Sequence, residues 1–440
     1  MLLQRGQTLV AHGMRAACVV EDPLGEGAQA EVYLARIGAL QFALKWYRPE
    51  YSASDPRRWE RLKQAISNGA PTENYLWPFD LVSMPRASSY GGYLMPLKPP
   101  GYVGFYDLMK GKTEPTFRAL VNSGFQLADS FLKLHAHGFC YYDINFGNIF
   151  FDPDTGDVRI ADTDNVDING RIGGIQGTHG FMAPEVARCE VPPNSASDRF
   201  SLAVLLFHIF MVGHPLYGRR QDELPYDAAD PDGTRRLCKD EPVFIFDPGD
   251  VSNRPVPGFH DCVVRFWNIY PQSLRELFTR AFTKGLRDPE SRVMENEWRR
   301  ELRILQDSIF ICPTPGCETQ NFFDVDRARN KQALNSCWAC NRPVPYPPRM
   351  RIGTHNDSKL VVLSPGTQLF PHHLENDTYN FKAPLAEVIT NTIGLKNLSH
   401  QTWSCKLQDG STIDVPPQGV LRFESNCRLH FGKVDAEVKL

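Results

Sequence analysis

Three polar residues at fixed spacing constrain this chain more than any other feature of its sequence. Asp143 and Asn148 stand five positions apart, and Asp162 follows fourteen positions after Asn148, directly behind the apolar run 158–161. A strand ending with this run would place Asp162 on a loop next to the first segment. Carboxylate and amide oxygens are the hard donors that Mg²⁺ prefers. We therefore expect a base, Asp143, and two metal ligands, Asn148 and Asp162, on adjacent loops.

Further segments in the same chain order extend this pattern. They are Leu24-Gly25-Glu26-Gly27, Phe42-Ala43-Leu44-Lys45, Gly177-Thr178, Pro184-Glu185, Asp198 and Arg287 to Arg292. Each is weak evidence alone, but together they resemble the protein kinases over roughly residues 18 to 305. The resemblance implies an α+β, bilobal kinase fold and phosphoryl transfer from ATP with Mg²⁺ or Mn²⁺. It implies the catalytic set Asp143, Lys45, Asn148 and Asp162.

The resemblance also implies a nucleotide site within the first hundred residues. Gly25 and Gly27 would let backbone N–H groups approach the phosphates, although Ala30 replaces the third glycine of the family pattern. The segment 93–98 resembles the connector that borders the adenine. The implied ATP contacts are Leu24, Gly25, Gly27, Val32, Ala43, Lys45, Glu60, Met95, Pro96 and Lys98.

Lys45 lies in the apolar run 42–46, where an unpaired ammonium group would be costly. It therefore needs anions, which the family supplies as the α- and β-phosphates and a helix glutamate. Glu60, on the amphipathic segment 55–67, is the candidate for that glutamate, whereas Gln64 is nearer the usual offset but carries no charge. The alternative for Glu60 is a solvated charge on the helix surface.

Three residues depart from the kinase pattern. Tyr142 replaces the Arg that captures a phosphate on the activation segment, so regulation by that route is not expected. Asn145 replaces a Lys near the transferred phosphoryl group, and Asp164 replaces a Gly and could disfavour ATP or hold a second metal. Aspartates after a strand can also be simple turn formers. Two functions stay open: an active kinase, or a nucleotide-binding pseudokinase that acts as a scaffold.

Four more residues take their roles from the resemblance. Thr178 would lie beside Asp143, where a Ser/Thr side chain enters, which implies a serine/threonine protein kinase. Glu185 would pair with Arg292 in a buried bidentate contact that fixes the segment. Asp198 would hold the catalytic loop through its backbone.

Two closely spaced cysteine pairs, Cys312 with Cys317 and Cys337 with Cys340, are separated by nineteen residues. Such pairs converge on one tetrahedral Zn²⁺ in zinc ribbons, and four thiolates leave no open position, so the metal would be structural. Disulfide bonds are the alternative. The odd total of eleven cysteines and a first segment without signal-peptide features disfavour them and favour the cytoplasm.

Length and charge bound the remaining possibilities. A chain of 440 residues exceeds what one core usually supports. A net charge of -3 argues against a nucleic-acid partner, and the longest apolar run, 202–212, is too short to cross a bilayer. The expected domains are a kinase domain at 1–308, with lobes at about 15–97 and 98–308, a zinc ribbon at 309–345 and a small β-rich domain at 346–440.

Short β-branched runs between turn residues suggest that residues 346–440 are all-β. Residues 397–403 and 428–432 faintly resemble half of a forkhead-associated sandwich, and a plain β-rich interaction module is the alternative. The whole combination is similar to bacterial kinases of tellurium-resistance gene neighbourhoods. That narrower resemblance implies a signalling or stress-response system, with a von Willebrand factor A protein and a PP2C phosphatase as partners.

Overall fold

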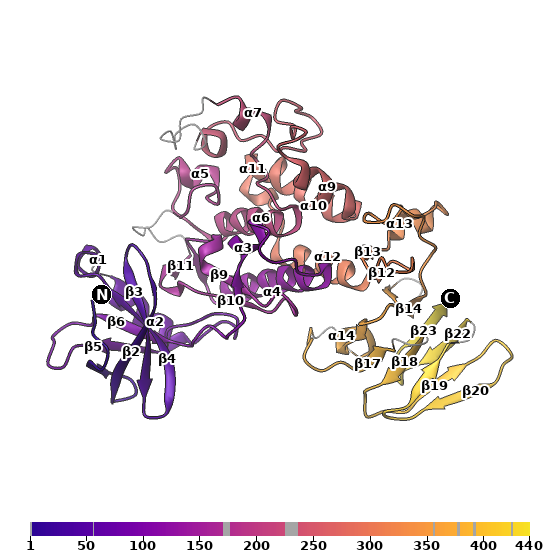
Figure 1. The fold of residues 1–440 in the computed structure, drawn as a ribbon, viewed down its shortest axis with the longest axis horizontal. Coiled ribbons are helices and arrows are strands. Elements are labelled where there is room, and N and C mark those ends of the chain that lie inside the picture. Colours follow the sequence, from indigo (N-terminus) through magenta and orange to yellow (C-terminus); the bar gives the residue numbers. More distant parts are fainter. Residues whose placement is uncertain are drawn as a thin grey trace. The chain divides into compact units, whose positions relative to one another are not determined.

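The computed structural model describes residues 2–55, 57–169, 177–224, 236–354, 357–375, 379–389, 393–423 and 426–440. It forms two compact units, Met1–Trp267 with Arg275–Arg299 and Asn268–Leu274 with Arg300–Leu440 (Figure 1). The division falls inside helix α12 (Glu295–Asp307), upstream of the boundary proposed at residue 308. Each unit has its own apolar cores.

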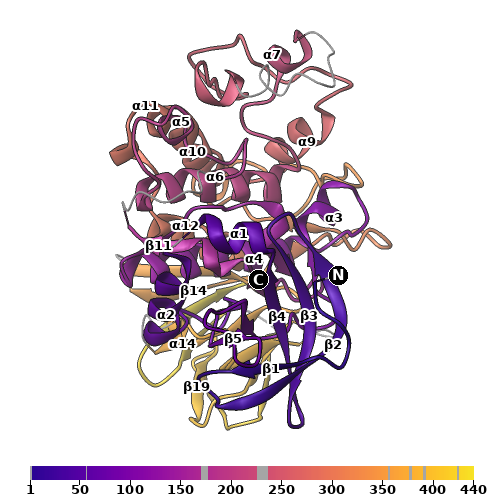
Figure 2. The same cartoon turned by 90° about the vertical axis from the view of Figure 1, so that its left-hand side faces the viewer.

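The small lobe of the first unit is a closed barrel with strand order β1-β2-β3-β4-β6-β5 (Figure 2). Its strands are β1 (Thr8–Ala11), β2 (Ala16–Glu26), β3 (Ala30–Ile37), β4 (Leu40–Tyr47), β5 (Asp80–Ser83) and β6 (Gly92–Met95). The buried side chains of Leu9, Tyr33 and Leu44 belong to one core. The small lobe was expected to start near residue 15, but it also includes β1. This strand pairs with both β2 and β5 and so closes the barrel. Helices α1 (Pro49–Ser54) and α2 (Arg58–Asn68) follow β4.

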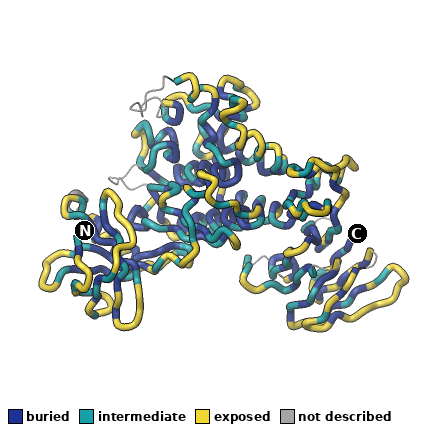
Figure 3. Tube along the Cα trace, viewed as in Figure 1, coloured by how far each residue is buried: buried dark blue, intermediate teal, exposed yellow. Residues whose placement is uncertain are grey.

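The large lobe is built around helices α4 (Phe117–Ala136) and α6 (Ser195–Met211). Thr116 Oγ1 accepts a hydrogen bond from Ala119 N at 3.2 Å and so caps α4. Figure 3 shows buried residues gathering where Figure 1 draws these two helices. The other helices are α3 (Phe105–Met109), α5 (Pro184–Ala187), α7 (Arg219–Asp222), α9 (Asp261–Ile269), α10 (Gln272–Phe282) and α11 (Lys284–Arg287). Within the described ranges, no helix combines the length and apolarity that a membrane span needs.

Short antiparallel strands bring two polar loops together. β8 (Phe139–Tyr141) pairs with β11 (Val166–Ile168), and β9 (Ile149–Phe151) pairs with β10 (Val158–Ile160) and β7 (Val103–Gly104). The first loop, between β8 and β9, ends in the 3-10 turn η1 (Phe146–Asn148), and the second, after β10, contains η2 (Thr163–Asn165). Ala161 N donates to Asn148 O at 2.7 Å, so the two loops are adjacent, as the spacing predicted.

The second unit contains the two closely spaced cysteine pairs and the remaining strands. β12 (Ile309–Ile311) pairs with β13 (Gln320–Phe322), and α13 (Val325–Arg329) follows. Two antiparallel sheets, β15-β14-β23-β22-β19-β20 and β16-β17-β18-β21, contribute to one core. They consist of β14 (Arg349–Thr354), β15 (Asp357–Val362), β16 (Gln368–Leu369), β17 (Ala386–Val388), β18 (Gly394–Asn397), β19 (Trp403–Lys406), β20 (Thr412–Val415), β21 (Val420–Arg422), β22 (Cys427–His430) and β23 (Asp435–Lys439), with helix α14 (Pro371–Leu374). A turn at 408–411 joins β19 to β20, and Gly410 has a φ of 88° there.

Candidate active site and metal centre

Lys45 on β4 lies at the centre of a buried polar cluster. Its Nζ forms ion pairs with Asp162 and, at 2.8 Å, with Asp164 Oδ1. The hydroxyls of Tyr47 and Tyr93 donate to Asp164 at 2.5 and 2.9 Å. Burial opposes the charge of Lys45, but Asp164 and Asp162 outweigh it and raise the pKa of Lys45. Burial of Asp164 is likewise outweighed by Lys45 and the two tyrosine hydroxyls, which lower the pKa of Asp164, so both groups are charged at neutral pH.

Glu60 does not occupy the place that the resemblance implied. It is exposed on α2, and the ion pairs of Lys45 go to Asp162 and Asp164 instead. The buried face of α2 carries Arg58, Leu62 and Ala65. Glu60 follows Arg58 by two residues, which is about 200° around a helix of 3.6 residues per turn. The carboxylate of Glu60 therefore points away from the barrel.

The inward side of α2 is cationic. The guanidinium carbon of Arg58 lies 4.4 Å from the centroid of the Tyr47 ring. Arg61 pairs with Asp55 at 2.6 Å and with Asp167 at 3.8 Å. No described carboxylate of α2 therefore reaches Lys45, and the negative charge beside this lysine comes from the loop after β10.

The candidate catalytic loop, residues 142–148, is held together by hydrogen bonds that converge on Asp143. Thr178 Oγ1 donates to Asp143 Oδ1 at 2.5 Å, which places this threonine beside the expected base. Asn148 Nδ2 donates to the Asp143 carbonyl at 2.9 Å. Asn145 Nδ2 donates to Thr178 Oγ1 at 3.0 Å and to the Asp143 carbonyl at 3.2 Å. Asn145 thus links the two segments at the position where the family has a lysine.

The other residues assigned to the nucleotide lie on β2, β3, β4 and β6 or in the connector after β6. Val32, Ala43 and Met95 share one apolar cluster, in which Ala43 and Met95 are register partners. A Cβ on Gly25 would meet no atom within 4 Å, and Gly27 N donates to Ala30 O at 2.9 Å across the hairpin. The Gly27 N–H is therefore used within the hairpin, and the side of the hairpin at Gly25 leaves room for a phosphate to approach the backbone. Leu24, Pro96 and Lys98 are exposed.

Asp198 on α6 is hydrogen-bonded to the backbone at Tyr141, directly before the loop that carries Asp143. Its Oδ2 accepts from the backbone N–H of Tyr141 at 2.6 Å, which is the backbone contact that the resemblance implied. His135 on α4 lies between Asp198 and Glu295, with ring nitrogens 3.0 and 2.6 Å from the two carboxylates. Burial disfavours the charged ring, but hydrogen bonds to Asp198 and Glu295 and their charges raise the pKa of His135 to about 9.

This histidine should make the first unit lose stability at alkaline pH. Because the pKa of His135 is raised in the folded state, its contribution is complete below its unfolded value and disappears as pH rises through about 9. A rise from 6.5 to about 9 corresponds to about 3 kcal/mol. Thermal unfolding between pH 6 and 10 measures the effect, with His135→Gln as the comparison. Equal slopes for wild type and variant would contradict this role.

The expected pair between Glu185 and Arg292 is present. Arg292 Nη1 and Nη2 each lie 2.8 Å from one carboxylate oxygen of Glu185, and the Arg292 side chain is 2% exposed. Arg292 Nη1 also donates to the carbonyl of Ala196, the second residue of α6. The bidentate contact therefore ties the Pro184-Glu185 segment to the core of the large lobe.

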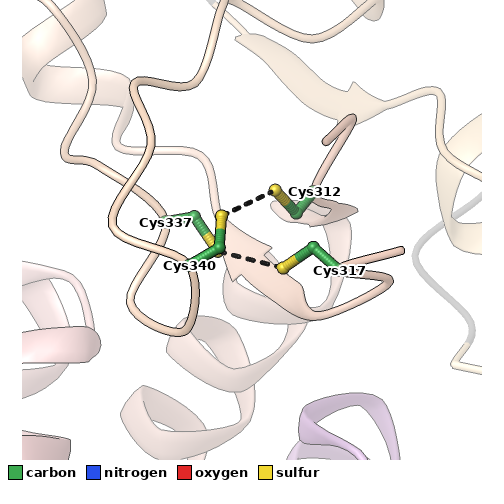
Figure 4. Close-up of side chains that lie close together, drawn as sticks. All are labelled: Cys312, Cys317, Cys337 and Cys340. Atoms are coloured by element: carbon green, nitrogen blue, oxygen red, sulfur yellow. Dashed lines mark hydrogen bonds between the residues drawn. The ribbon is translucent and has the colours of Figure 1, made fainter. Parts of the chain in front are cut away.

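Four thiols of the second unit meet at one point (Figure 4). The Sγ atoms of Cys312, Cys317, Cys337 and Cys340 all lie within 4.8 Å of one another. The Cys312–Cys340 and Cys317–Cys337 sulfur distances are 3.8 and 3.7 Å. Zn–S bonds of about 2.3 Å in tetrahedral geometry place sulfurs about 3.8 Å apart, whereas a disulfide requires about 2.05 Å. The donor set and its spacing therefore fit Zn²⁺.

Neighbouring polar groups favour the thiolate form of Cys337, whereas burial raises the pKa of Cys312 to about 11. Burial opposes the charge on Cys337, but the backbone N–H groups of Cys340 and Ala339 and the side chain of Asn321 outweigh it and lower the pKa of Cys337 to about 6. The Asn321 amide donates to Cys337 Sγ at 3.5 Å. Such outer contacts orient metal-binding thiolates and stabilise their charge.

Sequence reasoning missed three residues of the active-site region: Tyr47, Tyr93 and His135. Period-two alternation along β4 places Lys45 and Tyr47 on one face, and this signal could have found Tyr47. Tyr93 is the register partner of Lys45 on β6. This partnership depends on strand pairing that the sequence does not specify.

Part of the chain, including the loop that carries Asp143, matches a known protein family. Residues 107–244 match the family model of the protein kinase domain. CBL-interacting protein kinase 4 of Oryza sativa subsp. japonica is 29% identical over 130 residues, which cover 26% of this chain. The chain spans 28% of the length of that relative. The matched segment includes Asp143, Asn148 and Asp162, so this part of the chain is similar to a protein kinase domain.

Proposed function

We propose that this chain is an ATP-dependent serine/threonine protein kinase that phosphorylates a protein partner. The observation that supports it best is the contact of Thr178 and Asn148 with Asp143, next to a loop whose Asp162 pairs with Lys45. A base, two oxygen donors and a buried cation thus belong to one group of contacts. This is the set that phosphoryl transfer from a nucleotide requires.

Each residue of this group has a distinct task in the proposed reaction. Asp143 orients the attacking hydroxyl and accepts its proton, at the carboxylate that Thr178 contacts. Lys45 holds the α- and β-phosphates. Asn148 Oδ1 and the Asp162 carboxylate, which is 35% exposed, would hold Mg²⁺ or Mn²⁺. The metal, when bound, neutralises negative charge that builds up on the phosphates.

The serine/threonine specificity rests on Thr178. Its hydroxyl donates to Asp143 Oδ1, where a substrate hydroxyl would also be received. The partners proposed from the narrower resemblance are a von Willebrand factor A protein and a PP2C phosphatase of a bacterial stress-response system. Incubation with labelled ATP and Mg²⁺ or Mn²⁺, with and without these partners, tests the proposal. Label on serine or threonine supports it, and label on tyrosine alone contradicts the specificity.

A nucleotide-binding scaffold is the second candidate function. Asn145 favours it, because this neutral side chain stands where the family places a cation near the transferred phosphoryl group. ATP binding without label transfer to any partner would favour the scaffold over the kinase.

Activity should not require phosphorylation of residues 163–183, of which 170–176 lie outside the described residues. Tyr142 cannot capture a phosphate as an arginine would, and its hydroxyl donates to the Ile168 carbonyl at 3.1 Å. Phosphatase-treated protein, with removal checked by intact mass, is expected to keep most of its initial rate. Strict dependence on a phosphate at Thr178 would contradict this, since that side chain is hydrogen-bonded to Asp143.

A further inference from the structure

Asp164 has both carboxylate oxygens occupied by groups of the barrel. Oδ1 accepts from Lys45 Nζ at 2.8 Å and from the Tyr93 hydroxyl at 2.9 Å. Oδ2 accepts from Lys45 Nζ at 3.0 Å and from the Tyr47 hydroxyl at 2.5 Å. The Asp164 side chain is 4% exposed. A carboxylate with these four contacts has little capacity left for a metal ion, so a second metal site is disfavoured.

These contacts join three elements around Lys45. β4 provides Lys45 and Tyr47, β6 provides Tyr93, and Asp164 belongs to η2 after β10. Lys45 and Tyr93 are register partners, so Asp164 contacts two paired strands at one point. Strands β4 and β6 approach each other closely here, because a Cβ on Gly92 of β6 would lie 2.3 Å from the Lys45 carbonyl. The position of the lysine is therefore fixed from the η2 side.

We propose that Asp164 is the positioning residue that fixes Lys45 for the nucleotide phosphates, in place of a glutamate from helix α2. The inference rests on the proposed function. Asp162 also contacts Lys45, but Asp162 is the candidate metal ligand and so has a second task. Asp164 has no such task, and its two tyrosine contacts hold it in place.

The substitution Asp164→Asn distinguishes this role from simple charge repulsion, because the two predict opposite changes in the KM for ATP. If the carboxylate only repels phosphates, its neutralisation should lower the KM for ATP. If it positions Lys45, the loss of a charge-assisted contact in a buried site should raise that KM by about tenfold or more. Partial unfolding would reduce the number of active molecules and so kcat, while KM stayed constant. An unchanged or lowered KM would overturn the proposal.

A second variant covers the case in which Asp164→Asn does not fold. Tyr47→Phe combined with Tyr93→Phe keeps both rings and removes only the hydroxyls that hold Asp164. We expect the KM for ATP to rise several-fold. Tyr90→Phe is the matched control, since Tyr90 packs its ring against Trp59 and His12, and its KM should stay at the wild-type value. Glu60→Gln tests the alternative that a glutamate of α2 positions Lys45. A larger rise in the KM for ATP in Glu60→Gln than in Asp164→Asn would assign that role to Glu60 and overturn the proposal.

Direct ATP titration by calorimetry, with Mg²⁺ present, keeps this inference separate from the kinase assignment. Wild-type protein that binds ATP without transferring phosphate would refute the proposed function only. Weaker binding by Asp164→Asn than by wild type would then still support the positioning role. Equal binding by the two proteins would refute it, whether or not transfer is observed.

Discussion

Replacing Asp143 by Asn is expected to lower the rate of phosphoryl transfer by about 10²-fold or more. The amide keeps the size of the side chain and one oxygen that can still accept from Thr178 Oγ1. It cannot accept the proton of the attacking hydroxyl. ATP binding should persist, because the nucleotide contacts proposed for Lys45, Ala43 and Met95 lie on the barrel strands. Initial rates at saturating labelled ATP, together with ATP titration by calorimetry, measure both quantities.

A matched aspartate provides the control for this experiment. Asp154 lies in the exposed turn between β9 and β10, so Asp154→Asn should transfer phosphate at the wild-type rate. Undiminished transfer by Asp143→Asn would remove the residue from its proposed role. A loss of ATP binding in the same variant would show that the substitution disturbs the cleft, and the rate would then say nothing about the proton.

The second large effect is expected at the zinc centre. Each chain should carry one tightly bound Zn²⁺, and Cys337→Ser should release it and unfold residues 310–345. Structural zinc sites supply about 10–16 kcal/mol at neutral pH, which a segment this small cannot replace by apolar burial. Cys312 and Cys337 are themselves members of the local apolar cluster. Elemental analysis and hydrogen exchange measure the two effects.

The zinc segment also contacts strand β15 and the residues that follow it. The cluster that contains Cys312 and Cys337 also includes Val362 of β15, and Ile311 N donates to Ser364 Oγ at 3.1 Å. Zinc loss should therefore also speed exchange at β15, while ATP binding persists. Cys262→Ser, at an exposed cysteine, should keep the zinc. Absence of zinc after purification under reducing conditions, or a disulfide between any two of the four cysteines, would refute the site.

The contrast between the zinc centre and Lys45 shows what local sequence can predict here. The four cysteines come in pairs a few residues apart, so a short loop brings the two thiols of each pair together, and the spacing of the pairs is typical of a zinc ribbon. The spacing likewise predicted Asp143, Asn148 and Asp162 on adjacent loops, and the resemblance to protein kinases implied that Thr178 lies beside Asp143.

The partner of Lys45 depended on how a helix is rotated about its axis. Segment 55–67 was predicted as amphipathic, and α2 does form at Arg58–Asn68, but the face it buries carries Arg58 and not Glu60. Asp164 and Lys45 are 119 residues apart in the chain. They meet only because the fold brings the loop after β10 to strand β4. Such a contact leaves no periodic signal in the sequence.

The anchoring of Asp164 also has a consequence for the design of small-molecule ligands. A compound that needs the segment 162–164 to swing outward must first separate Asp164 from Lys45 and from two tyrosine hydroxyls. That would separate the buried ammonium group from its more deeply buried counter-charge, and removal of one partner of a buried pair costs several kcal/mol. Compounds that bind against Val32, Ala43 and Met95 demand no such rearrangement. We therefore expect ligands of this chain to come from the second class.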